Sequence, residues 1–197
     1  MTILEFYKDP DEIQALIKPA EEGNIEAQYK LGKYYDRKSV LAKVFFKKSI
    51  YWYRKAAEKN HLEAQHDLAQ AYMYAFYVEE INYKKAFYWF ERAANLNHLE
   101  SQCDLAFLYE SGLGTKQDYT KAYQWYRNAA KQGYPRGLFR LALLYADGNG
   151  VPQDYDKAYL LCKMYVEKSN PKDTFYLKKF YKMSSFSKKT NKKCKRR

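Results

Sequence analysis

The chain has 197 residues but little glycine, proline or cysteine, and each shortage narrows the possible structures. Eight glycines and five prolines are too few for long disordered stretches inside the folded part. The three cysteines, Cys103, Cys162 and Cys194, follow no paired spacing and belong to no CxxC or Cys/His cluster. This pattern does not fit a disulfide framework, so we expect reduced thiols in a cytoplasmic protein.

Long apolar runs and catalytic signatures are also missing. No stretch approaches the roughly 18 apolar residues that a membrane-spanning helix requires, and the first residues, MTILEFYKDPDEIQ, do not resemble a secretory signal. The sequence contains no HExxH, GxSxG, P-loop or GxGxxG motif. We therefore expect a non-enzymatic protein that uses no cofactor or metal.

What the sequence does contain is an internal repeat of 36 or 37 residues. Its leucines, at 31, 68, 105 and 141, are spaced 37, 37 and 36 residues apart. A second series, Trp52, Trp89, Trp125 and Leu161, is spaced 37, 36 and 36 residues apart. Periods in this range indicate stacked structural units, which favour binding over catalysis.

Each unit is predicted to form two helices. The first has apolar or small residues at one face, as in Ala64, Leu68, Ala69 and Tyr72. In the first three units the second helix has an aromatic pair and then Ala-Ala three residues later, as in WYRNAA at 125–130. We expect a half-repeat at 1–24, a capping helix at 170–183 and a basic disordered tail at 184–197. The four full repeats are predicted at 25–60, 61–97, 98–133 and 134–169.

Three kinds of position within the repeats carry further structural predictions. A small residue recurs one place after the repeat leucine, at Gly32, Ala69, Ala106 and Ala142, where it would allow close approach of the second helix. Asp118 and Asp154 are placed to cap second helices. His61 and His98 recur in the turn between units, where we interpret them as turn and packing residues.

The segments DYTKAYQWYRNAA (118–130) and GNGVPQDYDKA (148–158) resemble the Sel-1-like repeat, a relative of the tetratricopeptide repeat. The resemblance covers about residues 11–183. It implies an all-α fold, a right-handed α/α superhelix, and a monomeric scaffold or adaptor for a protein or peptide partner. Regulatory inhibitors of the immunity type and translocated bacterial effectors are alternatives within the family. A cysteine-rich secreted branch is associated with β-lactam binding, which we do not transfer because the paired cysteines are absent.

In repeats of this kind the first helices line a concave groove. Positions two before, two after and five after the repeat leucine are predicted to face a partner, with apolar anchors at Phe107, Phe139 and Leu143. The alternative is that some of these side chains pack between neighbouring first helices. The full set is Tyr29, Lys33, His66, Gln70, Met73, Cys103, Phe107, Glu110, Phe139 and Leu143.

Two further hypotheses concern the array itself. The apolar run that includes Val40, Leu41 and residues 44–46 could be a second binding surface or an extended second helix packed on the array. Cys103 and His66 occupy corresponding places in neighbouring units, so a Cys–His nucleophile pair is conceivable, although no oxyanion site accompanies it.

The net charge of +12 is concentrated at the C-terminal end. Residues 1–170 hold 24 Lys/Arg and 22 Asp/Glu, whereas residues 171–197 hold 11 Lys/Arg and one acid. The tail either only solubilises the chain or attaches it, without sequence specificity, to nucleic acid, an anionic membrane or an acidic protein. Its basic residues are Lys188, Lys189, Lys192, Lys193, Lys195, Arg196 and Arg197.

Overall fold

A computed structural model describes residues 10–39, 43–74, 81–169 and 174–194, and within these ranges all regular structure is helical. The chain divides into two compact units, Met1–Leu96 and Asn97–Arg197. Unit 1 contains α2 (Asp11–Glu21), α3 (Ile25–Ser39), α4 (Lys43–Glu58), α5 (Leu62–Met73) and α6 (Tyr83–Asn95). Unit 2 contains α7 (Leu99–Ser111), α8 (Tyr119–Lys131), α9 (Pro135–Asp147), α10 (Tyr155–Lys168) and α11 (Phe175–Cys194).

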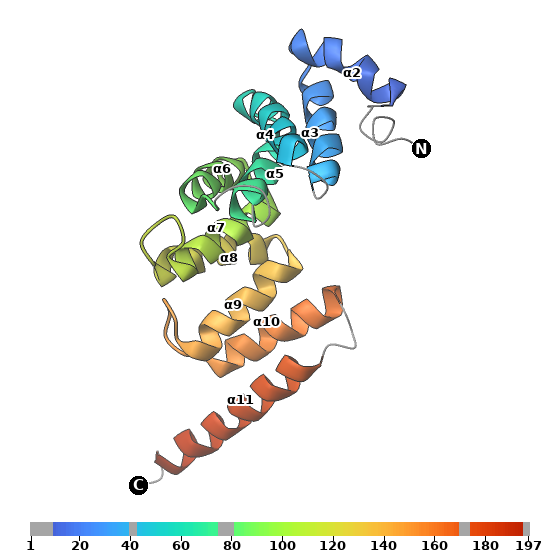
Figure 1. The fold of residues 1–197 in the computed structure, drawn as a ribbon. Helices are drawn as coiled ribbons and strands as arrows, with labels where there is room; N and C mark the ends of the chain where they lie inside the picture. The colour runs from blue at the N-terminus through green and yellow to red at the C-terminus, as the bar shows by residue number, and fades with distance from the viewer. Residues whose placement is uncertain (1–9, 40–42, 75–80, 170–173, 195–197) are drawn as a thin grey trace. The chain divides into compact units, whose positions relative to one another are not determined.

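Within each unit, helices that are neighbours in the sequence pack against one another (Figure 1). The first and second helices of the four repeats are α3/α4, α5/α6, α7/α8 and α9/α10, and α2 precedes them as the predicted half-repeat. The predicted all-α, helix-pair repeat architecture is confirmed. The repeat leucines lie in the cores of these helix pairs, where Leu31, Leu68 and Leu105 are 0 % exposed.

The turn from each second helix to the next first helix has the same construction. Its central residue takes a positive φ at Gly23, Asn60, Asn97 and Gly133. A side chain from the following second helix or its C-terminal end reaches back to three of these turns: Lys59 Nζ donates to Gly23 O (2.6 Å), Arg92 to Asn60 Oδ1 (2.9 Å) and Gln132 to Asn97 Oδ1 (2.8 Å). Each bond connects a second helix to the turn at the end of the preceding repeat, so these bonds help to fix how successive repeats stack inside each unit.

Side-chain caps begin most of the helices. Asp118 and Asp154 accept the backbone N–H of Lys121 and Lys157 (both 2.9 Å), which confirms their predicted role. His61 and His98 use Nδ1 to accept the N–H of the residue three places on (both 3.2 Å). The interpretation of these two histidines as turn residues is therefore confirmed, since an N-cap satisfies a backbone donor that the helix leaves unpaired.

The loop between the two helices differs among the repeats. In unit 2, Gly112 and Gly148 end the first helices in the left-handed conformation, which glycine adopts without steric cost. In repeat one, α3 and α4 are longer, with 15 and 16 residues against 13 in α7 and α8, whereas α5 has only 12. The first helix is therefore extended in repeat one and not in repeat two.

The apolar run of repeat one belongs mainly to the core. Phe45 and Phe46 are 3 % and 5 % exposed, and the ring of Phe45 stacks on that of Tyr35 at 6.2 Å. Val44 is exposed, and Val40 and Leu41 lie outside the described residues. The run is thus the start of a long second helix packed on the array, which was the alternative to a binding surface.

At the C-terminal end, α11 covers α10 through Phe180, which is 1 % exposed, while Lys178, Lys179 and Lys182 face outward as expected of a capping helix. The expectation that regular structure ends at Met183 is wrong, because the helix continues to Cys194. The side chains beyond Ser185 lie outside the description, so the predicted role of the basic residues at 188–197 stays a prediction.

In repeat one, the small residue that follows the repeat leucine is Gly32, and the structure leaves no room for a side chain there. A Cβ added to Gly32 would come closer than van der Waals contact to the ring of Tyr53, a buried residue of α4. We expect Gly32→Ala to lower the unfolding free energy of unit 1 by about 1–2 kcal/mol, because the cost of overpacking exceeds the helix-propensity gain. Urea denaturation followed by circular dichroism measures this change.

A double-mutant cycle provides the control. In a Tyr53→Leu background the added methyl group has more room, so the cost of Gly32→Ala should shrink. An equal cost in both backgrounds would show that the ring of Tyr53 is not what the methyl group meets.

Candidate functional site

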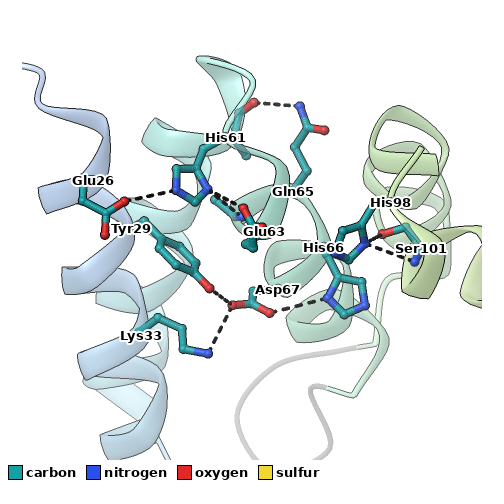
Figure 2. Close-up of polar contacts among 12 residues, drawn as sticks. Glu26, Tyr29, Lys33, His61, Glu63, Gln65, His66, Asp67, His98 and Ser101 are labelled. Atoms are coloured by element: carbon teal, nitrogen blue, oxygen red, sulfur yellow. Dashed lines mark hydrogen bonds and ion pairs between the residues drawn. The ribbon is translucent and has the colours of Figure 1, made fainter. Parts of the chain in front are cut away.

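Four of the predicted groove residues gather in unit 1 around a carboxylate that the position rule did not select. Tyr29 and Lys33 come from α3, His66 and Gln70 from α5, and Figure 2 shows three of them converging on Asp67. The Tyr29 hydroxyl donates to Asp67 Oδ2 (3.1 Å), Lys33 Nζ lies 3.6 Å from the same oxygen, and His66 Nδ1 lies 3.6 Å from Oδ1. The first helices of repeats one and two are therefore joined by a polar cluster.

Burial and charge both act on this cluster. Burial disfavours the carboxylate of Asp67, yet its hydrogen bonds with His66 and Tyr29 and the charge of Lys33 hold its pKa below the usual range. Burial, followed by the charge and hydrogen bond of Asp67, raises the pKa of Tyr29, so the phenol remains a donor at neutral pH. Burial and the charge of Asp67 also raise the pKa of Asp36 on the same face. The cluster thus combines a fixed anion, a half-exposed cation and hydrogen-bonding groups.

A second polar contact lies at the start of α5. The imidazole of His61 stacks on Tyr29 with ring centroids 4.4 Å apart, and its Nε2 lies 3.6 Å from Glu26 Oε2 (Figure 2). The side chains of Glu26 and Glu63 are more than half exposed. This face of unit 1 consequently offers a partner two exposed carboxylates together with the side chains around Asp67.

The linkage between Asp67 and pH gives a prediction. A carboxyl whose pKa is lower in the folded than in the unfolded chain stabilises the fold above its unfolded pKa of about 3.9, and this stabilisation is lost as pH falls through the folded pKa. We expect Asp67→Asn to cost about 1 kcal/mol at pH 7 and progressively less towards pH 3. Urea midpoints of the two proteins across this range measure the difference.

The interpretation must take account of Asp36, which changes stability in the opposite direction and which no longer faces the charge of Asp67 in the variant. Its raised pKa makes the ionised form a cost that disappears on acidification. A stability difference that did not change between pH 7 and pH 3 would contradict the ionic role of Asp67.

In unit 2, the predicted groove residues lie in less polar surroundings. Phe107 is half-buried, and the guanidinium carbon of Arg140 lies 5.7 Å from its ring centroid. Phe139 contacts the rings of Tyr165 (5.0 Å) and Tyr176 (5.1 Å) and lines a hollow of about 320 Å³. The walls of this hollow are Tyr134, Pro135, Arg136, Phe139 and Tyr165.

Several predicted groove residues are already engaged within the protein. Leu143 packs against the core cluster that contains Phe180, and Glu110 Oε2 accepts a hydrogen bond from the Tyr126 hydroxyl (2.8 Å). The packing alternative therefore applies to Leu143, and in part to Phe139, which also lines the hollow.

For two other residues, the prediction that their side chains face a groove is wrong. Met73 is 5 % exposed and Cys103 is 0 % exposed, so neither side chain is available to a partner. Burial also raises the pKa of Cys103 to about 12, which leaves almost no thiolate at neutral pH. The hypothetical Cys–His nucleophile pair therefore has no support at Cys103.

Sequence reasoning missed the residues one place before the repeat leucine. This position holds Asp67 in unit 1, and Asp104 and Arg140 in unit 2. Asp104 is 2 % exposed and its Oδ1 lies 2.5 Å from Arg136 Nη2. The sequence signal that could have identified them is that charged residues recur at this position, directly before a leucine that is buried in every repeat.

Within the described residues there is no group of three or more His, Cys, Asp or Glu side chains that could hold a metal ion. The same part of the chain contains no helix with the length and apolar character needed to cross a membrane.

Comparison with known proteins places these observations in a family. The sequence model of the Sel1 repeat matches residues 25–61, 62–98, 99–134 and 135–164. A search of curated proteins gives no significant match.

Similar solved structures include the following three. A Sel1 repeat protein from Oxalobacter formigenes is 32 % identical with a TM-score of 0.72, and the match covers 87 % of this chain and 67 % of that one. The protective antigen c5321 of uropathogenic Escherichia coli is 30 % identical with a TM-score of 0.73 over 80 % of this chain, but this chain spans only 33 % of its length. Helicobacter pylori cysteine-rich protein B is 26 % identical, with a TM-score of 0.51 and coverage of 66 % and 93 %. The repeat matches, the helix pairs and these similarities show that the chain belongs to the Sel1 repeat family.

Proposed function

We propose that this protein is a non-enzymatic scaffold or adaptor that binds a protein or peptide partner on the faces of its first helices. Sel1 repeats generally form scaffolds for protein interactions, which supports the class of function. The observation that carries the proposal is the Asp67 cluster, where partly exposed polar side chains from two successive first helices lie within contact of one another.

The two units would contribute different chemistry. Lys33, whose side chain is 44 % exposed, and the exposed carboxylates of Glu26 and Glu63 would select the partner by charge in unit 1. In unit 2 a partner would contact Phe107 and place an apolar side chain in the hollow beside Phe139. Truncation of one buried aromatic anchor typically costs about 2 kcal/mol or more of binding free energy.

Site-specific photo-crosslinking tests this assignment. A benzophenone amino acid at Phe107 should crosslink the partner in cells, because the half-buried ring borders the proposed binding face. The matched control places the same amino acid at Leu160, which is 57 % exposed on the outer side of α10. Equal crosslinking to one protein from both positions, or from Leu160 alone, would contradict binding on the first-helix face.

A further inference from the structure

The outer face of α4 carries an unusual concentration of positive charge. Its exposed residues include only one acid, Glu58, and two large apolar side chains, Val44 and Tyr51. All the others are basic: Lys43, Lys47, Lys48, Arg54 and Lys55. This local excess of positive charge is not visible in the near-neutral net charge of residues 1–170.

Three of these lysines form a row with an aromatic ring inside it. Lys43, Lys47, Tyr51 and Lys55 follow one another every four residues, which places successive side chains about 6 Å apart along the helix axis. No ion pair with Lys43, Lys47 or Lys55 occurs among the described residues. Their charges are therefore available to an external anion.

Tyr51 is presented to solvent in a fixed orientation. It is 51 % exposed, its ring meets the indole of Trp52 edge-on at 4.9 Å, and Lys55 Nζ lies 5.7 Å from its centroid. Tyr88 repeats this arrangement one repeat later, with Trp89 at 5.0 Å and the Arg92 guanidinium carbon at 5.8 Å. Exposed rings held among cations are the elements on which unpaired bases stack in single-strand-binding proteins.

A hollow of about 280 Å³ adjoins this row, and Tyr51, Trp52, Lys55 and Lys59 form one wall of it. The opposite side includes Gln28, which is 3 % exposed and whose Oε1 has no hydrogen-bond partner, and the acidic Glu21. The hollow is smaller than sites for drug-sized ligands, so it suits one flat ring.

We propose that the outer face of α4 and the adjoining hollow bind a single-stranded nucleic acid, with phosphates along the lysine row and a base against Tyr51. A membrane surface fits less well, because an interfacial helix needs a wide apolar face and α4 exposes only Val44 and Tyr51. This surface is distinct from the basic tail and from the first-helix face, so the inference extends beyond the proposed scaffold function.

Fluorescence polarisation with the full chain and a labelled single-stranded DNA of about 12 nucleotides tests the proposal. Lys47→Glu combined with Lys55→Glu should weaken binding at least tenfold and make the dependence on salt shallower by about 1.4 logarithmic units per unit of log salt. Tyr51→Ala should weaken binding about tenfold without changing the salt dependence. Circular dichroism checks that each variant is folded.

The control variant, Lys131→Glu with Lys163→Glu, makes the same change of charge at exposed positions of α8 and α10. It should weaken binding less than twofold. Equal weakening by both variants, failure of the wild-type chain to bind, or equally effective competition by poly-glutamate would overturn the proposal. Binding to vesicles of anionic phospholipid without binding to DNA would overturn it in favour of a membrane surface.

Discussion

Replacing Tyr126 by alanine should lower the unfolding free energy of unit 2 by about 3–5 kcal/mol, one of the two largest effects expected for a single substitution. Tyr126 is 0 % exposed in the packed seam between α7 and α8. The substitution would create a cavity and remove the hydrogen bond to Glu110. Because domains are stable by only about 5–15 kcal/mol, unit 2 should unfold at a much lower urea concentration.

Two further variants separate packing from the hydrogen bond. Tyr126→Phe keeps the ring and should cost about 1.5–3 kcal/mol, the range for a hydrogen bond to a charged group. Tyr88→Ala removes a tyrosine that is 50 % exposed and should cost less than about 1 kcal/mol. Equal losses for Tyr126→Ala and Tyr88→Ala would contradict the packing described for unit 2.

The second large effect is expected at the ion pair of Asp104 and Arg136. Asp104 is 2 % exposed, whereas the side chain of Arg136 is 39 % exposed. Burial lowers the pKa of Arg136, but the charge and hydrogen bond of Asp104 outweigh it and raise the pKa overall. Arg136→Met would remove the cation that faces a buried carboxylate, and we expect a loss of about 2–3 kcal/mol, reduced from the fully buried case by the exposure of Arg136.

The double variant Asp104→Asn, Arg136→Met is the control for this ion pair. It removes the buried charge as well as its partner and should recover at least half of the loss, as urea denaturation at pH 7 would show. A double variant no more stable than Arg136→Met would mean that Arg136 acts through its packing alone.

The helix pairs were predictable because their signals repeat. A leucine or tryptophan that returns every 36 or 37 residues identifies the same structural position four times, and the caps at Asp118 and Asp154 follow from turn chemistry. The helix beyond Met183 gave no such signal, because it lacks apolar periodicity. The first turns of α11 pack on α10 and provide the nucleus of the helix. Because lysine is a good helix former, the helix can propagate beyond Met183 without an apolar face there.

The candidate site was only partly predictable, because neighbouring repeats decide what each outward position meets. The position two before the repeat leucine is half-exposed at Tyr29 and fully buried at Cys103. Asp67 was not selected because the charge at this position changes sign from repeat to repeat: Lys30 and Arg140 are basic, and only Asp104 is also acidic. The basic row of α4 was missed for a different reason. The net charge of residues 1–170 is close to zero, and this sum does not show that basic side chains gather on one face of one helix.

The central claim, that a partner binds the first-helix face, is tested most directly by quantitative affinity capture with paired variants. Lys33→Ala with Gln70→Ala alters the face around Asp67, and Lys84→Ala with Asn95→Ala makes a matched change at exposed positions of α6. The account predicts a protein that the wild-type chain and the α6 variant both retain and that the first-helix variant loses. Retention of every partner by the first-helix variant, with the fold intact, would contradict it.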